Sequence, residues 1–433
     1  MRYIDTLLSQ AQKIPSITAI SGFDSSNNYR SLTYAEMTTE ATKLSSLMDD
    51  SNTPQNILIR SGNTLDTFVL MLAAMMSNRA SVVINPAVPP KALDALVQNL
   101  PFKISIFESA ALEAAVTVNT DKPDINKNML FYVTTSGTTG RPKLVEFTDQ
   151  NLFALIETIF DFNNFTGKAL MATPTSLLAT IGMALPCFTN GGSVELMPNW
   201  DPEYFVSKLE GTQATVLSPA QINMLRVSHP DLYPVGSPVV ILAGAKITKE
   251  NRDWSKEHLS PNTWVVYGTT ETSAITGLRP DDSDEFAGSV GKPLSGVNIS
   301  FSESGEITIS RPGLRENFKP GDIGYESEGF IYLTDRTDDL INVGGRKVHP
   351  SQVEAAASDF PGVQEVVIVA AKHDIMGEVP VAFIVGDADT QALESYLREV
   401  LEPYMVPRTY ITVEDLPMSP AGKLLRSALR ERV

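Results

Sequence analysis

The stretch TTSGTTGRPK, residues 134–143, places two glycines, four threonines and one serine ahead of a proline and a lysine. Glycines let backbone N–H groups converge on an anion, hydroxyls add hydrogen-bond donors, and Lys143 adds charge. The stretch does not match the P-loop pattern G-x-x-x-x-G-K-[ST], because Arg141 and Pro142 separate the glycines from Lys143. From these residues alone, a polar turn and an anion-binding loop are equally good interpretations.

Apolar strands and amphipathic helices alternate around this stretch. From residue 56 the chain reads as strand NILIR, a helix from Thr64 to Asn78, strand SVVIN, helix PKALDALVQNL and strand KISIF. Strand FYVTT leads into the stretch, and NLFALIETIFDF after it has helical spacing, which places the loop between a strand and a helix. This order predicts a mostly parallel sheet, in which ligands bind at the carboxyl ends of the strands.

The later part of the chain repeats this pattern and then changes it. ATVLSP, PVVILAGA and WVVYGTT are short β-rich runs that end in small polar residues, so we expect their ends to converge on one crevice. Short strands with glycine turns between residues 288 and 333 predict a small β-rich subdomain. We predict an α/β fold with a large N-terminal domain of α/β layers, residues 1–337, and a small mobile α+β C-terminal domain, residues 338–433.

Composition excludes several classes of protein. A net charge of −17 disfavours nucleic acid as a partner, and the single cysteine, Cys187, forms no internal disulfide or zinc cluster. The first residues carry charges where a signal peptide needs an apolar core, which predicts a cytoplasmic protein. The longest apolar run, Phe68 to Met76, is about half the length of a membrane span and is expected to form a buried helix.

Five motifs decide between the two interpretations of the opening stretch. They are TSGTTGRPK (135–143), YGTTE (267–271), GDIGY (321–325), DRTDDLINVGGRKVHPSQVE (335–354) and SPAGKLLR (419–426). In this order they resemble the ANL superfamily of adenylate-forming, AMP-binding enzymes, which includes acyl- and aryl-CoA synthetases. The resemblance covers nearly the whole chain. It implies ATP- and Mg²⁺-dependent activation of a carboxylic acid to an acyl-adenylate with release of pyrophosphate, followed by thioester formation with coenzyme A.

The resemblance assigns roles to individual residues. A carboxylate that attacks a phosphate needs positive charge and hydrogen-bond donors around the transition state. The phosphate-covering loop would consist of Thr135, Ser136, Gly137, Thr138, Thr139, Gly140 and Lys143. In YGTTE, Tyr267 would lie against adenine, Gly268 and Thr269 would line the nucleotide site, Thr270 would bind the α-phosphate, and Glu271 would bind Mg²⁺.

Other matching positions complete the implied nucleotide site. Gly244 and Ala245 would let the backbone approach adenine and the acyl group, although a tight turn is the alternative. Asp322 would bind the ribose hydroxyls, and Arg336 would reach the ribose and the phosphate. Otherwise each would be an ordinary solvated charge.

The C-terminal motifs imply a moving domain. Asp338 matches the hinge about which the small domain rotates between the two half-reactions, and Gly344 and Gly345 would line the passage for the thiol. Lys423 would enter the site for adenylation and bridge carboxylate and phosphate. Thr270, Glu271, Lys143, Arg336 and Lys423 are thus the predicted catalytic residues.

The acid pocket is predicted from ATPTSLLATIG, residues 172–182, and from Leu177, Leu178, Gly244 and Thr269. No aspartate is present in this segment to pair with a substrate ammonium, so a fatty or aromatic acid is favoured over an α-amino acid. Two alternatives remain open: loading of the acid onto the phosphopantetheine of an acyl carrier protein, and a catalytically silent nucleotide-binding regulatory protein.

Overall fold

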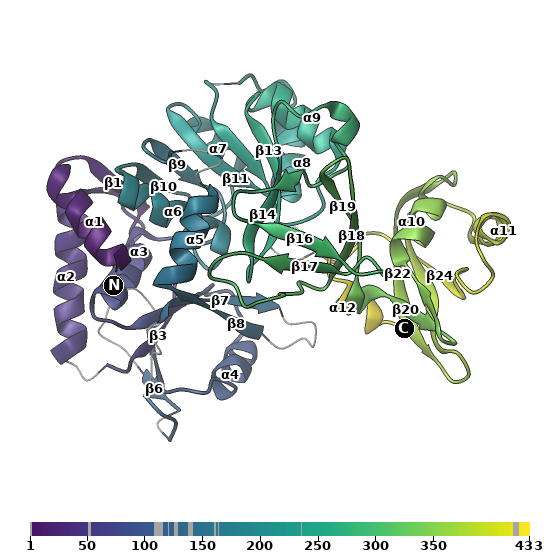
Figure 1. The fold of residues 1–433 in the computed structure, drawn as a ribbon, viewed down its shortest axis with the longest axis horizontal. Helices are drawn as coiled ribbons and strands as arrows, with labels where there is room; N and C mark the ends of the chain where they lie inside the picture. Colours follow the sequence, from purple (N-terminus) through teal and green to yellow (C-terminus); the bar gives the residue numbers. More distant parts are fainter. Residues whose placement is uncertain are drawn as a thin grey trace. The chain divides into compact units, whose positions relative to one another are not determined.

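The computed structural model describes residues 2–50, 53–107, 116–119, 121–124, 129–136, 142–159, 162, 164–234, 236–418 and 424–433. The chain forms two compact units, and Figure 1 labels most of their helices and many of their strands. Unit 1 comprises Met1–Asn298 and Ser310–Glu316, and unit 2 comprises Ile299–Ile309 and Asn317–Val433. The chain therefore passes between the units at 298/299, 309/310 and 316/317, and the bend at Asp338 stays a prediction.

The first sheet of unit 1 has six strands in the order β6-β5-β3-β4-β7-β8. The four central strands run parallel; they are β5 (Ile104–Phe107), β3 (Asn56–Arg60), β4 (Ala80–Ile84) and β7 (Met129–Ser136). The edge strands β6 (Val116–Val118) and β8 (Pro142–Thr148) pair antiparallel. The connections include α3 (Leu65–Met76) and α4 (Pro90–Gln98), as expected for a parallel sheet.

Strand β8 corrects the expectation that the opening stretch leads from a strand into a helix. Residues Pro142–Thr148 pair with β7, with Thr135 opposite Lys143, and α5 (Asp149–Ile159) begins only afterwards. Within β8 the exposed Glu146 is followed by the buried Phe147, the alternation typical of a strand. The helical spacing of the next segment obscured this short signal. The two ends of the stretch thus belong to paired strands, residues 134–136 to β7 and residues 142 and 143 to β8.

The second sheet of unit 1 has nine strands in the order β15-β14-β13-β12-β11-β9-β10-β1-β2. The six neighbours from β13 to β1 run parallel; they are β13 (Thr263–Thr269), β12 (Val239–Leu242), β11 (Thr212–Leu217), β9 (Lys168–Met171), β10 (Ser193–Leu196) and β1 (Thr18–Phe23). The antiparallel strands are β2 (Tyr29–Thr33), β14 (Ser273–Leu278) and β15 (Lys292–Pro293). The helices that accompany this sheet are α6 (Leu178–Asn190), α7 (Pro202–Lys208), α8 (Pro219–Ser228), α9 (Lys249–His258) and the 3₁₀ helix η2 (Asp284–Phe286).

Helix α3 is buried on every side, which explains why its sequence is apolar all round. It contacts β1 of the nine-stranded sheet as well as β4 and β7 of the six-stranded sheet. Helices α1 (Arg2–Lys13) and α2 (Tyr34–Asp50) pack in the same region. The predicted buried helix is therefore confirmed, and among the described residues no helix is long and apolar enough to cross a membrane.

Unit 2 begins with two small hairpins and continues with a five-stranded sheet. The hairpins consist of β16 (Asn298–Phe301) with β17 (Ile307–Ser310), and β18 (Asp322–Ser327) with β19 (Phe330–Arg336). The 3₁₀ helix η3 (Thr337–Asp339) leads to the sheet strands β20 (Ile341–Val343), β21 (Arg346–Val348), β22 (Val363–His373), β23 (Gly377–Gly386) and β24 (Thr409–Val413). Its helices are α10 (Pro350–Ser358), α11 (Thr390–Val400) and α12 (Arg426–Arg430).

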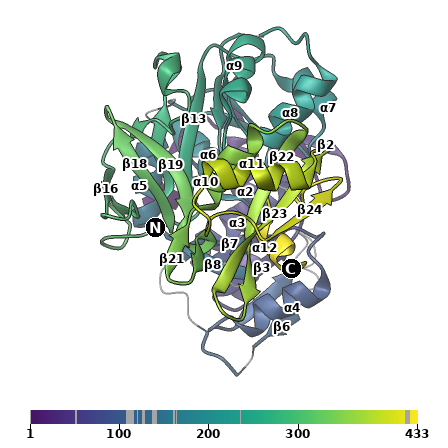
Figure 2. The ribbon, with the colours of Figure 1, turned by 90° about the vertical axis from the view of Figure 1, so that its right-hand side faces the viewer.

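Alternating side chains give the sheet of unit 2 two apolar faces. Ile368 and Ile384 pack with α10 and α11, which cover the same face in Figure 2. Val369 and Phe383 point the other way and pack with Leu429 of α12. A large α/β unit and a smaller α+β unit are therefore both present, and the predicted fold class is confirmed.

Candidate active site

The loops that leave the parallel strands of the nine-stranded sheet lie at one edge of unit 1. Strands β9, β11, β12 and β13 are parallel neighbours, so the loops that follow them are neighbours as well. The ends of these strands, with the segments that follow them, carry residues 172–178, 218–221, 243–245 and 267–272. The predicted site residues Gly244, Tyr267 and Glu271 therefore lie at the same edge of the sheet. This agrees with the prediction that the strand ends converge on one crevice.

The turn between β13 and β14, residues 268–273, is closed by its own hydrogen bonds. The amide of Thr269 donates to Oγ1 of Thr272 at 2.9 Å, and the amide of Thr272 donates to Oγ1 of Thr269 at 3.3 Å. A Cβ on Gly268 would lie 1.8 Å from the carbonyl oxygen of Ser273, so only glycine fits there. The turn leaves Glu271 exposed and Thr270 half-buried, whereas the Thr269 hydroxyl is engaged within the turn.

Gly244 follows β12 in a conformation that favours glycine. Its φ of +95° is in the left-handed region, and a Cβ there would meet no atom within 4 Å. The chain is fixed just before it, because the amide of Ala243 donates to the carbonyl of Leu217 at 3.1 Å. Glycine is therefore required by the backbone, and the open space beside it agrees with the predicted approach of a ligand.

Asn63 organises the segment predicted to line the acid pocket, a role that the sequence did not reveal. It lies after β3 of the six-stranded sheet, and its Nδ2 donates to the carbonyls of Thr173 (3.2 Å) and Met197 (3.1 Å). Its Oδ1 accepts from the amide of Thr175 at 2.5 Å. One amide side chain thus ties the segment before α6, including the half-buried Leu177, to both sheets of unit 1.

A second side chain that the sequence analysis missed fixes the start of the same segment. Nε2 of Gln221 donates to the carbonyl of Ala172 at 2.6 Å, while its Oε1 accepts from the amide of Ser218 at 2.9 Å. Ser218 and Gln221 form a capping box at the start of α8. The pattern S-x-x-Q before a helix was the available signal.

Replacing Asn63 with aspartate is expected to destabilise the protein by about 1–3 kcal/mol, because both donors are lost and a carboxylate faces two carbonyl oxygens. Urea denaturation measures this loss, and the Michaelis constant for the acid is expected to rise with it. Asn223→Asp, at an exposed position of α8, is the matched control and is expected to unfold like the parent. Equal stability of Asn63→Asp and the parent would refute the role given to Asn63.

Asp322 and Arg336, which the sequence assigned separately to the nucleotide, pair with each other in unit 2. They lie opposite one another on β18 and β19, and Nη1 of Arg336 donates to Oδ1 of Asp322 at 2.8 Å. Nη2 of Arg336 also donates to the carbonyl of Pro320 at 3.2 Å. The carboxyl of Asp322 is largely buried, and the arginine fixes its orientation.

The predicted hinge is held by the C-terminal helix of unit 2. Nη2 of Arg430 donates to the carbonyl of Asp338 (3.1 Å) and to Oδ1 of Asp339 (2.7 Å). Arg426, one turn earlier in α12, pairs with Glu354 of α10 at 2.7 Å. Helix α12, which follows the segment of Lys423, is therefore tied to the backbone at the predicted hinge.

A buried carboxylate joins the two sides of the predicted hinge. Asp335, before Asp338, accepts from His349 Nδ1 at 2.8 Å and from the hydroxyl of Ser351 at 2.7 Å. Rotation about Asp338 would pull these partners apart.

Gly344 and Gly345 form the turn between β20 and β21. Their φ values of +59° and +88° are both in the left-handed region, as a two-residue hairpin of this kind requires. The structure thus explains both glycines by backbone conformation, and their predicted contact with the thiol remains a prediction.

Several predicted residues lie outside the part that the structure describes. They are Gly137, Thr138, Thr139, Gly140 and Lys423. The backbone of Thr135 and Ser136 belongs to the end of β7, and Lys143 is exposed at the start of β8. The structure therefore describes the two strands that flank the predicted phosphate loop.

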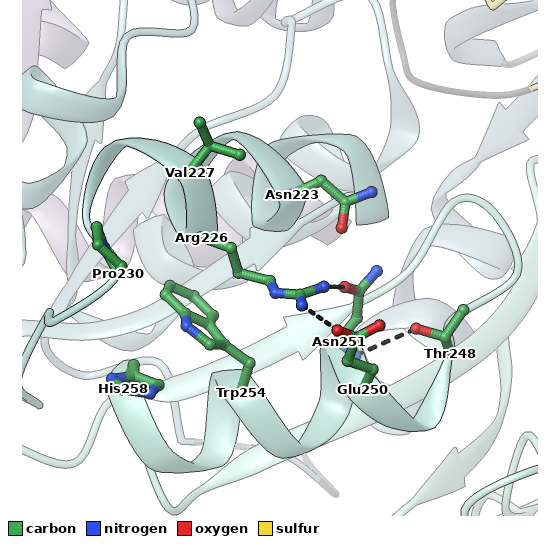
Figure 3. A pocket seen from close by; sticks show the side chains of 9 residues that line it. All are labelled: Asn223, Arg226, Val227, Pro230, Thr248, Glu250, Asn251, Trp254 and His258. Carbon is green, nitrogen blue, oxygen red and sulfur yellow. Dashed lines mark hydrogen bonds and ion pairs between the residues drawn. The ribbon is translucent and has the colours of Figure 1, made fainter. Parts of the chain in front are cut away.

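A groove of about 690 Å³ between α8 and α9 is separate from the predicted site residues (Figure 3). Arg226 reaches across it to Oδ1 of Asn251 at 3.2 Å and pairs with Glu250. The rings of Trp254 and His258 stack at its other end, 5.0 Å apart. Because the charge of Arg226 is paired within the groove, this surface does not provide the cationic site that a nucleotide needs.

Comparisons with known protein families match the chain along most of its length. The AMP-binding enzyme family matches residues 7–127 and 101–314. The family of AMP-binding enzyme C-terminal domains matches residues 352–423. Among curated proteins, a 2-succinylbenzoate–CoA ligase from Listeria monocytogenes is 30% identical over 323 residues, covering 69% of each chain. The corresponding ligase from Bacillus licheniformis is 32% identical over 329 residues, covering 68% of each chain.

Solved structures share the fold over nearly the whole chain. ATP-bound MatB from Rhodopseudomonas palustris matches with a TM-score of 0.81 at 21% identity, covering 99% of this chain and 98% of that one. The o-succinylbenzoate CoA synthetase of Bacillus subtilis, in complex with its acyl-adenylate intermediate, matches with a TM-score of 0.80 at 22% identity, covering 98% and 97%. At these identities the likeness establishes the fold.

Proposed function

Because this chain belongs to the AMP-binding enzyme family, we propose that it is an AMP-forming acid–CoA ligase whose acid is aromatic. The chain activates a carboxylic acid with ATP, releases pyrophosphate, and transfers the acyl group to coenzyme A. The observation that carries this conclusion is the match to both domains of the family in chain order, together with CoA ligases as relatives at 30% and 32% identity.

The proposed acid is 2-succinylbenzoate, the substrate in the names of these relatives. The segment held by Asn63 carries the hydroxyl residues Thr175 and Ser176, which are followed directly by the apolar Leu177 and Leu178. Such a segment suits an aromatic ring that bears additional polar groups.

The residues of unit 1 would stabilise charge at the reacting phosphate. In the proposal, Thr270 donates to the α-phosphate and Lys143 brings positive charge to the leaving pyrophosphate. Tyr267, half-buried at the end of β13, offers its ring to adenine. The reciprocal hydrogen bonds between Thr269 and Thr272 support this proposal, because they close the short turn that carries Thr270 and Glu271.

Glu271 fits a magnesium site that the nucleotide completes. The described residues include no group of three or more His, Cys, Asp or Glu side chains able to hold a metal ion. Mg²⁺ characteristically binds through one or two carboxylates together with substrate phosphates, and the exposed Glu271 provides such a carboxylate. When bound there, the ion would supply positive charge to the phosphate oxygens.

Acid-dependent exchange of labelled pyrophosphate into ATP tests the first half-reaction, and thioester analysis tests the second. We expect 2-succinylbenzoate to support exchange and coenzyme A to yield its thioester. Benzoate and long-chain fatty acids are the comparison substrates. Exchange with none of a broad panel of acids, in a protein that still binds ATP, would contradict the ligase function. A thioester formed on a carrier protein but not on coenzyme A would replace the proposed acceptor.

A further inference from the structure

Arg311 reaches the turn that carries Thr270 and Glu271 from a distant part of the chain. Its Nη1 donates to the carbonyl oxygens of Thr272 at 2.8 Å and Ala274 at 3.1 Å. The two carbonyls lie on either side of Ser273, whose φ of +56° is unusual for a residue with a side chain. Arg311 therefore binds the turn where its backbone conformation is least favourable.

The guanidinium group of Arg311 is largely withdrawn from water. Burial lowers the pKa of Arg311, and the negative charge of Glu157, on α5, opposes that effect. A buried cation is costly unless polar groups satisfy it. Here those groups are the two carbonyl oxygens of the turn, so the arginine and the turn satisfy each other within unit 1.

The segment that contains Arg311 is docked at a second point. A Cβ on Gly313 would lie 2.9 Å from Cα of Asn151, so the backbone passes directly against the start of α5. Residues 310–316 belong to unit 1 although the residues on both sides of them belong to unit 2. The position of Arg311 is therefore set by contacts with unit 1.

We infer that Arg311 is a positioning residue for adenylation: it holds the 268–273 turn so that Thr270 and Glu271 face the nucleotide before the nucleotide binds. The inference rests on the proposed ligase function. Without Arg311, the reciprocal bonds of Thr269 and Thr272 would remain, but two carbonyls beside Ser273 would lose their donor. The turn would then sample other conformations, and a small displacement of a catalytic group is costly.

The test compares Arg311→Met and Arg311→Lys with Arg315→Met, an exposed arginine of the same segment. Amide hydrogen exchange of residues 269–274 reports on the turn without turnover, and we expect it to be about tenfold faster in Arg311→Met. Pyrophosphate exchange is expected to fall about 10²-fold in kcat. Thioester formation from a preformed acyl-adenylate is expected to stay within about threefold of the parent. Arg311→Lys is expected to restore part of the protection from hydrogen exchange and part of the pyrophosphate exchange that Arg311→Met loses. Arg315→Met is expected to match the parent in both measurements.

Each outcome of these measurements supports or contradicts the positioning role of Arg311. Unchanged hydrogen exchange at 269–274 in Arg311→Met would overturn the inference, as would equal losses in both half-reactions. If Arg311→Met fails to fold, Arg311→Lys provides the test instead. Its ammonium group replaces the guanidinium only in part, so hydrogen exchange of the turn must still be measurably faster than in the parent. A parent protein without pyrophosphate exchange would refute the proposed function, while the hydrogen-exchange comparison would still decide whether Arg311 holds the turn.

Discussion

Lys423→Ala is expected to suppress acid-dependent pyrophosphate exchange by about 10²–10³-fold, since adenylation brings a carboxylate to a phosphate and the ammonium group would stabilise both. Thioester formation from a preformed acyl-adenylate no longer requires that approach of two anions. It is therefore expected to change by less than about threefold. Measuring the two half-reactions separately provides the comparison.

Lys372→Ala, at an exposed position of β22, is the matched control for the loss of one lysine from unit 2. The anchoring of α12 is expected to survive in Lys423→Ala, because Arg426 keeps its bonds to Glu354 and to the carbonyl of Ile368. A fold defect would reduce both half-reactions. Equal losses in Lys423→Ala would therefore contradict a role specific to adenylation.

Asp338→Pro is expected to lower thioester formation about 10²-fold while adenylation is largely retained. Proline fixes its own φ and restricts the preceding residue, Thr337, so the backbone would no longer rotate at this position. The carbonyl that accepts from Arg430 is kept in this variant, as is the pair of Arg430 with Asp339. The local anchoring of the predicted hinge is thus preserved, and its freedom to rotate is removed.

Asp338→Ala is the matched control, because it removes the same carboxylate and leaves the backbone free. We expect both half-reactions of Asp338→Ala to remain close to those of the parent. Rapid-quench measurement of acyl-adenylate and thioester in single turnovers would show acyl-adenylate accumulating only in the proline variant. A normal overall rate in Asp338→Pro would count against rotation at this residue.

The sequence predicted the elements whose residues form apolar or periodic runs. The apolar strands and the buried helix α3 were visible in this way, whereas Gly344 and Gly345 were assigned to the thiol passage and their turn came from the structure. Strand β8 was missed because it is only seven residues long and directly precedes a stronger helical pattern. The position of the predicted motif is unchanged, but a strand and not a helix follows it.

Contacts that depend on register or on distant segments were beyond the sequence. Counting back from the Ser327–Phe330 pair of the β18–β19 hairpin would place Asp335 opposite Asp322, but a shift between Ile323 and Gly324 places Arg336 there. Asn63 acquires its three partners only because two sheets meet at their strand ends. The hydrogen bond from Arg311 to Thr272 joins residues that are 39 positions apart, so no local sequence pattern predicts it.

The crossing of the chain from one unit to the other and back also bears on synthesis. Proteins fold from the N-terminus as they emerge from the ribosome. A nascent chain that ends at Asn298 already contains every strand of the nine-stranded sheet, yet Arg311 and Gly313 have not been made. Unit 1 can reach its final state only after residue 316 has emerged, when unit 2 has contributed just residues 299–309. The two units therefore mature in an order that the ribosome enforces, and the turn with Glu271 is among the last parts of unit 1 to be secured.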